Sequence, residues 1–179
     1  MSNTPRVYIV CLASYNNGIL HGKWAKAVDV DDLNEAIADV IKTSPQPDAE
    51  EWALHDYENF YGLESKFGEN PDVELLCAIG AWILSDGEPV AGFLDIRHVP
   101  DSVDDVLGAQ MEFQDSYQGT WADFDTYAEY VFDYLYLHDV PEQVHDYIDY
   151  EKFARSLSYD GYAEHDLSDG NVAIFNMNY

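Results

Sequence analysis

Apolar runs separated by polar turns fill the first third of the chain and predict a small sheet with one helix. The helix is indicated by Leu33, Ile37 and Val40, which recur at helical spacing after a candidate N-cap at Asp29 or Asp31. The turn Asn16-Asn17-Gly18 would join the first two strands. The predicted strands are residues 7–13, 19–27 and 51–57.

The middle of the chain predicts helices, and the last third predicts a second mixed region. The middle helices are expected from Asp72 to Asp86 and, after Pro100, over residues 103–111. Further helices are expected over residues 124–135, from Pro141 and from Asp149. The predicted extended segments are residues 111–121 and a closing hairpin of residues 159–163 and 172–177.

The amino-acid composition indicates a folded protein with an unusual charge. Of 179 residues, 47% are hydrophobic and 15% aromatic, which is enough to build a core and unlike a disordered acidic tail. The formal net charge is −27, from 35 acidic and 8 basic residues. Because lysine and arginine supply most of the affinity for phosphates, this composition excludes direct nucleic-acid binding, and anionic membranes would repel the chain. A cationic partner is therefore expected.

The excess of acidic residues is concentrated in the second half of the chain. From His98 to Glu151, 54 positions hold 14 acidic residues and no lysine or arginine. Asp125, Glu129 and Asp133 lie four apart on a predicted helix, where like charges cost roughly 0.2–0.5 kcal/mol per pair. A turn of helix advances about 5.4 Å, so such a column has a pitch near that of DNA phosphates.

This pattern indicates a surface that imitates the charge of DNA. The candidate partner-binding carboxylates are Asp101, Asp104, Asp105, Glu112, Asp115, Asp123, Asp125, Glu129, Asp133, Asp139, Glu142, Asp146, Asp149 and Glu151. A general acidic surface of the kind found in salt-loving organisms is the competing interpretation. Lys23, Lys26 and Lys42 interrupt the acidity of the first third, which favours a directed surface.

The sequence offers no basis for catalysis, and we predict neither catalytic residues, a metal nor a cofactor. Four His-Asp dipeptides resemble phosphohydrolase ligands, but no lysine or arginine lies near His138 or His145 to hold a phosphate. The acidic run from Asp29 to Asp32 lacks the glycine of a calcium loop. Cys11 and Cys77 lie in apolar runs, which indicates buried thiols in a reducing compartment. With no signal peptide or membrane span in the sequence, we expect a cytoplasmic protein.

Three blocks of sequence, in order along the chain, resemble the ArdA antirestriction family. They are YNNGILHGKW at residues 15–24, preceded by Val7-Tyr8-Ile9, EWALHDYE at residues 51–58, and YIDYEKFARSL at residues 147–157. Residues 62–110 resemble the family mainly in the kinds of residue they contain and less in exact sequence.

The resemblance implies an α+β fold of three small domains in a line, elongated and curved like bent duplex DNA. The expected domains are an α/β domain at residues 1–62, a mainly helical domain at 63–107 and an α/β domain at 108–179. It further implies a homodimer, encoded on a mobile genetic element, that fills the DNA-binding groove of the specificity and modification subunits of a Type I restriction–modification enzyme. An acidic protein that masks another DNA-binding protein is the alternative function, because every DNA-binding groove is basic.

Overall fold

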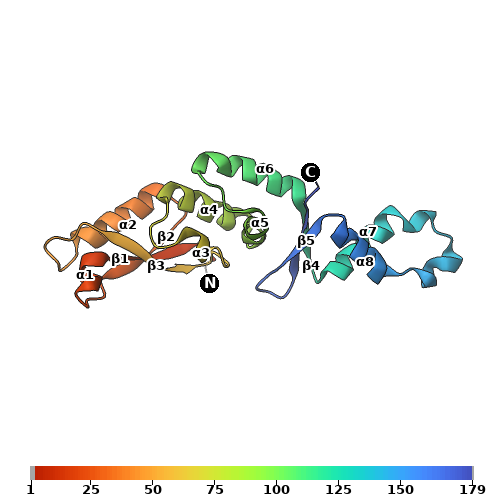
Figure 1. Cartoon of the computed structure of the whole chain (residues 1–179), viewed down its shortest axis with the longest axis horizontal. Coiled ribbons are helices and arrows are strands. Elements are labelled where there is room, and N and C mark those ends of the chain that lie inside the picture. The colour runs from red at the N-terminus through yellow and green to blue at the C-terminus, as the bar shows by residue number, and fades with distance from the viewer. Residues whose placement is uncertain (1–2, 179) are drawn as a thin grey trace. The chain divides into compact units, whose positions relative to one another are not determined.

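The computed structural model describes residues 3–178, and the chain forms two compact units. Unit 1 comprises Met1–Ala109 and unit 2 comprises Gln110–Tyr179. Each unit contains one small antiparallel sheet with helices, so the predicted α+β class is confirmed (Figure 1). The division into three domains and the elongated, curved shape stay predictions from the family resemblance.

Unit 1 is built on a sheet with the strand order β2-β1-β3. Its strands are β1 (Arg6–Cys11), β2 (Gly22–Lys26) and β3 (Trp52–Glu58), all paired antiparallel. The predicted strands are confirmed in place, but the first ends two residues earlier than predicted and the second is shorter than predicted at both ends. Residues 12–13 instead open a short helix, α1 (Leu12–Asn16), and Gly18 follows it with a φ of 74° that favours glycine.

Helix α2 (Val30–Lys42) covers β1 and β2 as the sequence pattern predicts. Asp29 is its N-cap, and Leu33, Ile37 and Val40 are buried. Because the apolar residues fall on one face, burying that face against the sheet stabilises a helix that would be marginal alone.

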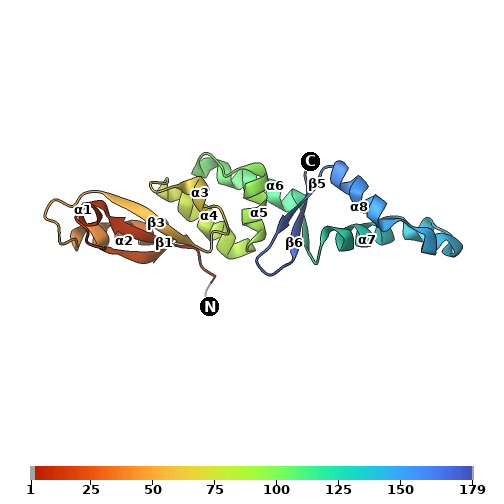
Figure 2. The same cartoon turned by 60° about the horizontal axis from the view of Figure 1, so that its bottom comes forward.

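Three more helices complete most of unit 1: α3 (Glu64–Phe67), α4 (Val73–Asp86) and α5 (Pro89–Arg97). Figure 2 shows α4 and α5 next to one another, and α4 also contacts α2. Gly80 brings the α4 backbone against the end of β2, since a Cβ there would lie 1.9 Å from the Ala27 carbonyl oxygen. Helix α5 was not predicted. Its residues from Val90 to Leu94 are all buried, so no polar face marks it in the sequence.

The prediction of an extended segment over residues 111–121 is wrong in its first half. After the single turn η1 (Val103–Asp105), helix α6 (Val106–Ser116) continues through this region, and β4 (Tyr117–Trp121) begins only at Tyr117. Phe113 and Ser116 are buried while Glu112, Gln114 and Asp115 are exposed, a three-residue spacing that suits a helix. Because the segment has few apolar residues, this spacing gives a weak signal in the sequence.

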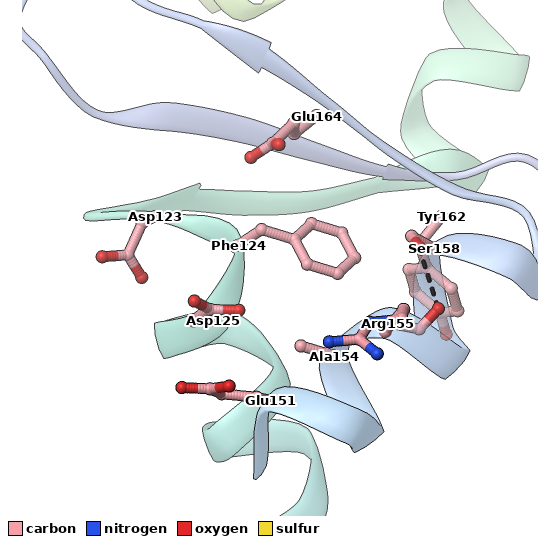
Figure 3. A pocket seen from close by; sticks show the side chains of 9 residues that line it. All are labelled: Asp123, Phe124, Asp125, Glu151, Ala154, Arg155, Ser158, Tyr162 and Glu164. Carbon is pink, nitrogen blue, oxygen red and sulfur yellow. Dashed lines mark hydrogen bonds between the residues drawn. The ribbon is translucent and has the colours of Figure 1, made fainter.

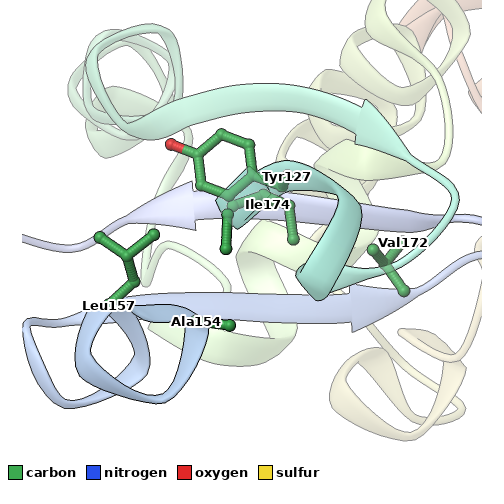
Figure 4. Packing of buried hydrophobic residues seen from close by; sticks show 6 residues of the cluster. Tyr127, Ala154, Leu157, Val172 and Ile174 are labelled. Atoms are coloured by element: carbon green, nitrogen blue, oxygen red, sulfur yellow. The ribbon is translucent and has the colours of Figure 1, made fainter. Parts of the chain in front are cut away.

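Unit 2 has a sheet with the order β4-β6-β5, formed by β4, β5 (Tyr162–Asp166) and β6 (Val172–Asn176). The central strand β6 is buried on both faces. Val172 and Ile174 join a core with Tyr127 (Figure 4), while Phe175 packs near Phe113 on the other face. The predicted hairpin is therefore confirmed, with its first strand three residues later than predicted.

The remaining elements of unit 2 are α7 (Phe124–Leu135), α8 (Tyr150–Tyr159) and two 3-10 helices, η2 (Leu137–Asp139) and η3 (Glu142–Tyr147). Helices α7 and α8 contact each other, and both supply residues to the core in Figure 4. Pro141 precedes the first turn of η3, where its fixed φ suits the start of a helix.

Candidate functional site

All of the carboxylates predicted to bind a partner belong to exposed residues. Asp101, Asp104 and Asp105 lie in unit 1, before and within η1. The remaining eleven lie in unit 2. Unit 2 holds 15 acidic residues against Lys152 and Arg155, so its surface is strongly negative by itself.

The column of like charges on α7 points to solvent. Asp125, Glu129 and Asp133 are exposed on successive turns, and Tyr127 and Ala128 are buried on the face of α7 that packs into the core. The amphipathic pattern of α7 thus turns the whole acidic column outward.

Contact with α8 orients the last carboxylate of this column. The Tyr150 hydroxyl donates a hydrogen bond to Asp133 Oδ1 at 2.7 Å. This hydrogen bond to Asp133, followed by partial desolvation and the charges of Asp133 and Glu129, raises the pKa of Tyr150 to about 12, so the hydroxyl keeps its proton at neutral pH. The side chain of Asp133 is therefore tied to the neighbouring helix by this hydrogen bond.

Two of the predicted carboxylates also cap helices. Asp123 Oδ1 accepts from the Thr126 amide at 2.7 Å at the start of α7, and Asp149 Oδ1 accepts from the Lys152 amide at 2.9 Å at the start of α8. Hydrogen bonding from Thr126, its side chain first and its amide second, lowers the pKa of Asp123. These acids stabilise the fold and add negative charge to the surface.

The acidic residues after α7 lie on the two 3-10 helices. Asp139, Glu142 and Asp146 are exposed there. His138 and His145 make local contacts: His138 Nε2 lies 3.3 Å from Asp139 Oδ2, and His145 Nε2 lies 2.9 Å from the Val140 carbonyl oxygen. Within residues 3–178 no three His, Cys, Asp or Glu side chains converge as a metal site would require.

A hollow of about 530 Å³ lies between α7, α8 and β5, and acidic residues line much of it (Figure 3). Three of them were predicted from the sequence: Asp123, Asp125 and Glu151. Arg155 is the single basic residue of its lining, and the rings of Phe124 and Tyr162 form apolar parts of the wall.

Glu164 completes this lining and is not among the carboxylates predicted from the sequence, because it lies outside the stretch that lacks lysine and arginine. Partial burial raises its pKa, and the charges of Asp166, Asp125 and Asp123 raise it further. The alternation of strand β5, which places Tyr162, Glu164 and Asp166 on one face, was the available signal.

Both cysteines are buried and free, as the sequence predicts. Among the described residues, no helix is long and apolar enough to cross a membrane.

Comparison with curated proteins gives no match. The family model for the antirestriction protein ArdA matches residues 7–168, most of the chain, including the three blocks of sequence that resemble this family. This family consists of inhibitor proteins and is not a catalytic one. The length of the match shows that the chain belongs to the ArdA antirestriction family.

Proposed function

We propose that this antirestriction protein imitates B-DNA with its surface carboxylates and competes with DNA for the binding groove of a Type I restriction–modification enzyme. Family membership implies the antirestriction function. The mechanism rests on one observation: all 14 acidic residues between His98 and Glu151 are exposed, and no lysine or arginine lies among them.

The physical basis is electrostatic complementarity. A groove that binds DNA presents lysine and arginine side chains to a dense row of phosphates. A folded surface with carboxylates at helical pitch offers the same sign of charge, which speeds encounter and favours basic partners. Following the family resemblance, we assign the contact to the specificity and modification subunits and expect the inhibitor to act as a homodimer.

The arrangement of the acids supports a directed surface over uniform acidity. Unit 1 holds 20 acidic and 6 basic residues, and three of those basic residues form ion pairs: Arg6 with Glu58, Lys23 with Asp39 and Lys66 with Asp95. Unit 2 has 2 basic residues for 15 acidic ones. A surface adapted only to high salt has no reason to differ in this way between the two units.

Competition binding tests the proposal directly. The purified protein is titrated into a Type I methyltransferase core bound to labelled duplex DNA. We expect displacement at near-stoichiometric concentration, and displacement that weakens as salt rises because the contacts are ionic.

Matched triple variants then locate the binding surface. Neutralising the α7 column with Asp125→Asn, Glu129→Gln and Asp133→Asn is expected to raise the concentration needed for displacement. The control removes three exposed charges from α2 in unit 1, with Asp31→Asn, Asp32→Asn and Glu35→Gln. It is expected to raise the concentration needed for displacement much less.

Because many carboxylates share the contact, no single neutralisation should abolish displacement. A folded protein that fails to displace DNA at large excess would refute the Type I target. It would favour the alternative, an acidic protein that masks another DNA-binding protein. Equal losses in both triple variants would instead favour an acidic surface of the halophile type, with no dedicated face.

A further inference from the structure

Three neighbouring aromatic rings, which we term the aromatic ladder, lead from β4 onto the exposed side of α7: Trp121, Tyr130 and Tyr134. The Trp121 and Tyr130 ring centroids are 4.9 Å apart. Tyr130 and Tyr134 are stacked, with centroids 6.0 Å apart and an interplanar angle of 12°. The two tyrosines lie one turn apart on the helix, so their side chains meet.

The ladder is fixed at one end and open at the other. Trp121 is half-buried, donates its Nε1 hydrogen to the Gln118 carbonyl oxygen at 3.0 Å, and packs against the core with its ring 5.4 Å from that of Tyr127. Exposure then rises to 50% at Tyr130 and 71% at Tyr134. Aromatic side chains this exposed leave apolar area in water that the fold of unit 2 does not use.

The acidic column of α7 runs beside the ladder. Glu129 precedes Tyr130 in the sequence, and Asp133 lies three residues after Tyr130, so it is a surface neighbour of that ring. Asp133 is also held in place by the Tyr150 hydroxyl at 2.7 Å. Aromatic faces and carboxylates therefore stand side by side on a pre-organised helix.

We propose that the aromatic ladder binds arginine side chains of the basic partner, with the guanidinium over a tyrosine ring and its N–H groups toward Glu129 or Asp133. This inference rests on the proposed function and specifies the partner's chemistry. A planar guanidinium stacks on an aromatic face and still presents donors at its edge, whereas an ammonium is compact and strongly hydrated. The ladder thus selects arginine over lysine, a distinction that carboxylates alone make poorly.

The same combination occurs within unit 1. The Arg6 guanidinium carbon lies 5.1 Å from the centre of the Trp24 ring, and Arg6 Nε donates to Glu58 Oε2 at 2.6 Å. One guanidinium there contacts an aromatic face and a carboxylate at once. The ladder offers those two partners without an arginine of its own, since Arg155, the arginine of unit 2, lies on α8 beside the hollow.

Binding of oligoarginine and oligolysine peptides of equal length to the full-length protein tests the inference. The wild-type protein is expected to prefer oligoarginine. Tyr130→Leu and Tyr134→Leu should each lose roughly two- to five-fold in affinity for oligoarginine, the change expected for one exposed cation–π contact, and bind oligolysine as before. Tyr134→Phe keeps the ring and should keep the preference. The control Tyr159→Leu removes an 83% exposed tyrosine of α8 outside the ladder and should leave both affinities unchanged.

Two results would overturn the inference. One is an unchanged ratio of the two affinities in Tyr130→Leu and Tyr134→Leu, with circular dichroism showing that both variants fold. The other is a loss of self-association in these variants, measured by sedimentation, because the ladder would then be a contact between copies of the chain.

These results can be separated from a failure of the proposed function. DNA displacement without a ladder-dependent arginine preference leaves the mimic standing and rejects the ladder. A ladder-dependent preference without displacement supports the ladder and moves the target to another arginine-rich protein.

Discussion

Aspartate begins four of the longer helices, and each of these side chains closes the first turn. Asp29, Asp72, Asp123 and Asp149 accept hydrogen bonds from backbone amides two or three residues later, at distances from 2.7 to 3.1 Å. Negative charge at a helix N-terminus also interacts well with the helix dipole. Part of the acidity of the chain is thus a structural requirement, independent of any partner.

Two variants of Asp149 separate the contribution of its capping hydrogen bond to stability from the contribution of its charge. Asp149→Ala is expected to lower the free energy of unfolding by about 1 kcal/mol, because the Lys152 amide loses its acceptor. Asp149→Asn removes the same charge but keeps an oxygen acceptor and should cost much less. Urea denaturation measures both, with Asp146→Ala, an exposed acid outside any cap, as control. Equal losses for Asp149→Ala and Asp149→Asn would show that charge matters more than the cap.

Glu164 is predicted to disfavour folding at neutral pH. Partial burial and nearby acids raise its pKa above the unfolded value, so its charged form is less stable in the folded chain. This destabilisation is absent below the unfolded pKa, grows as pH rises through the interval up to the folded pKa, and persists above it. Glu164→Gln should therefore raise the free energy of unfolding at neutral pH and leave it unchanged in acid.

Asp169, in the turn of the same hairpin, is predicted to stabilise the folded state at neutral pH, which is the opposite of Glu164. It therefore serves as the comparison. It accepts from the amide and side chain of Asn171, which lowers its pKa. Its stabilising contribution is present above the unfolded pKa and is lost as pH falls through the folded pKa. Asp169→Asn should not stabilise the protein at neutral pH. Unfolding curves of both variants at neutral and acidic pH check this, and equal behaviour of the two would contradict the assignment.

At the scale of one helix, α7 carries a charge pattern that opposes its own stability. Glu129 repels both Asp125 and Asp133 one turn away on either side. Glu129→Lys would replace two repulsive pairs with two attractive ones and should raise the free energy of unfolding by roughly 1 kcal/mol. The same change should weaken DNA displacement by a few-fold. Thermal unfolding and the competition assay measure the two effects, and Glu129→Gln should fall between. A variant that is both more stable and equally inhibitory would show that the column is not part of the binding surface.

Gly80 decides how closely α4 approaches the sheet of unit 1. Gly80→Ala places a Cβ 1.9 Å from the Ala27 carbonyl oxygen, a backbone atom that cannot rotate away. Overpacking of this kind costs about 1–3 kcal/mol, which outweighs the roughly 1 kcal/mol that alanine gains in helix propensity. Gly108→Ala in α6 meets no atom within 4 Å and should stabilise the protein slightly. Chemical denaturation compares the two, and stabilisation by Gly80→Ala would refute the close approach.

Elements with a one-sided apolar pattern or a capping aspartate were predictable from the sequence. Helices α2, α4, α7 and α8 begin after an aspartate that was proposed as a cap or sits where the helix was expected to start. Helix α5 could not be predicted in this way because its residues from Val90 to Leu94 are all buried, which removes the periodicity there. The prediction for the first half of residues 111–121 was wrong for the opposite reason, because exposed residues there leave little apolar pattern in the sequence.

The candidate site was predictable as a set of residues and not as a surface. A charge count identifies the stretch from His98 to Glu151, and exposure follows from the cost of burying a carboxylate. Glu164 and the aromatic ladder required the structure. Glu164 reaches the hollow through strand pairing, and Trp121 meets Tyr130 only because β4 and α7 pack together.

At the scale of the whole chain, the net charge of −27 sets the response of the protein to salt. Carboxylates that repel one another destabilise the folded state, and salt screens them over a Debye length of about 10 Å at 0.1 M. The unfolding temperature should therefore rise with added sodium chloride. A neutral osmolyte at equal osmolarity is the control for solvent effects that do not depend on charge.

The same salt should weaken the complex with a basic partner, because screening acts on attraction as well as on repulsion. Stability and inhibition are thus expected to move in opposite directions along one salt titration, followed by thermal unfolding and by DNA displacement. A surface that is acidic only as an adaptation to salt shares the rise in stability but shows no specific displacement to lose. If the unfolding temperature were independent of salt, or displacement strengthened as salt rose, electrostatic repulsion and mimicry could not both be properties of this surface.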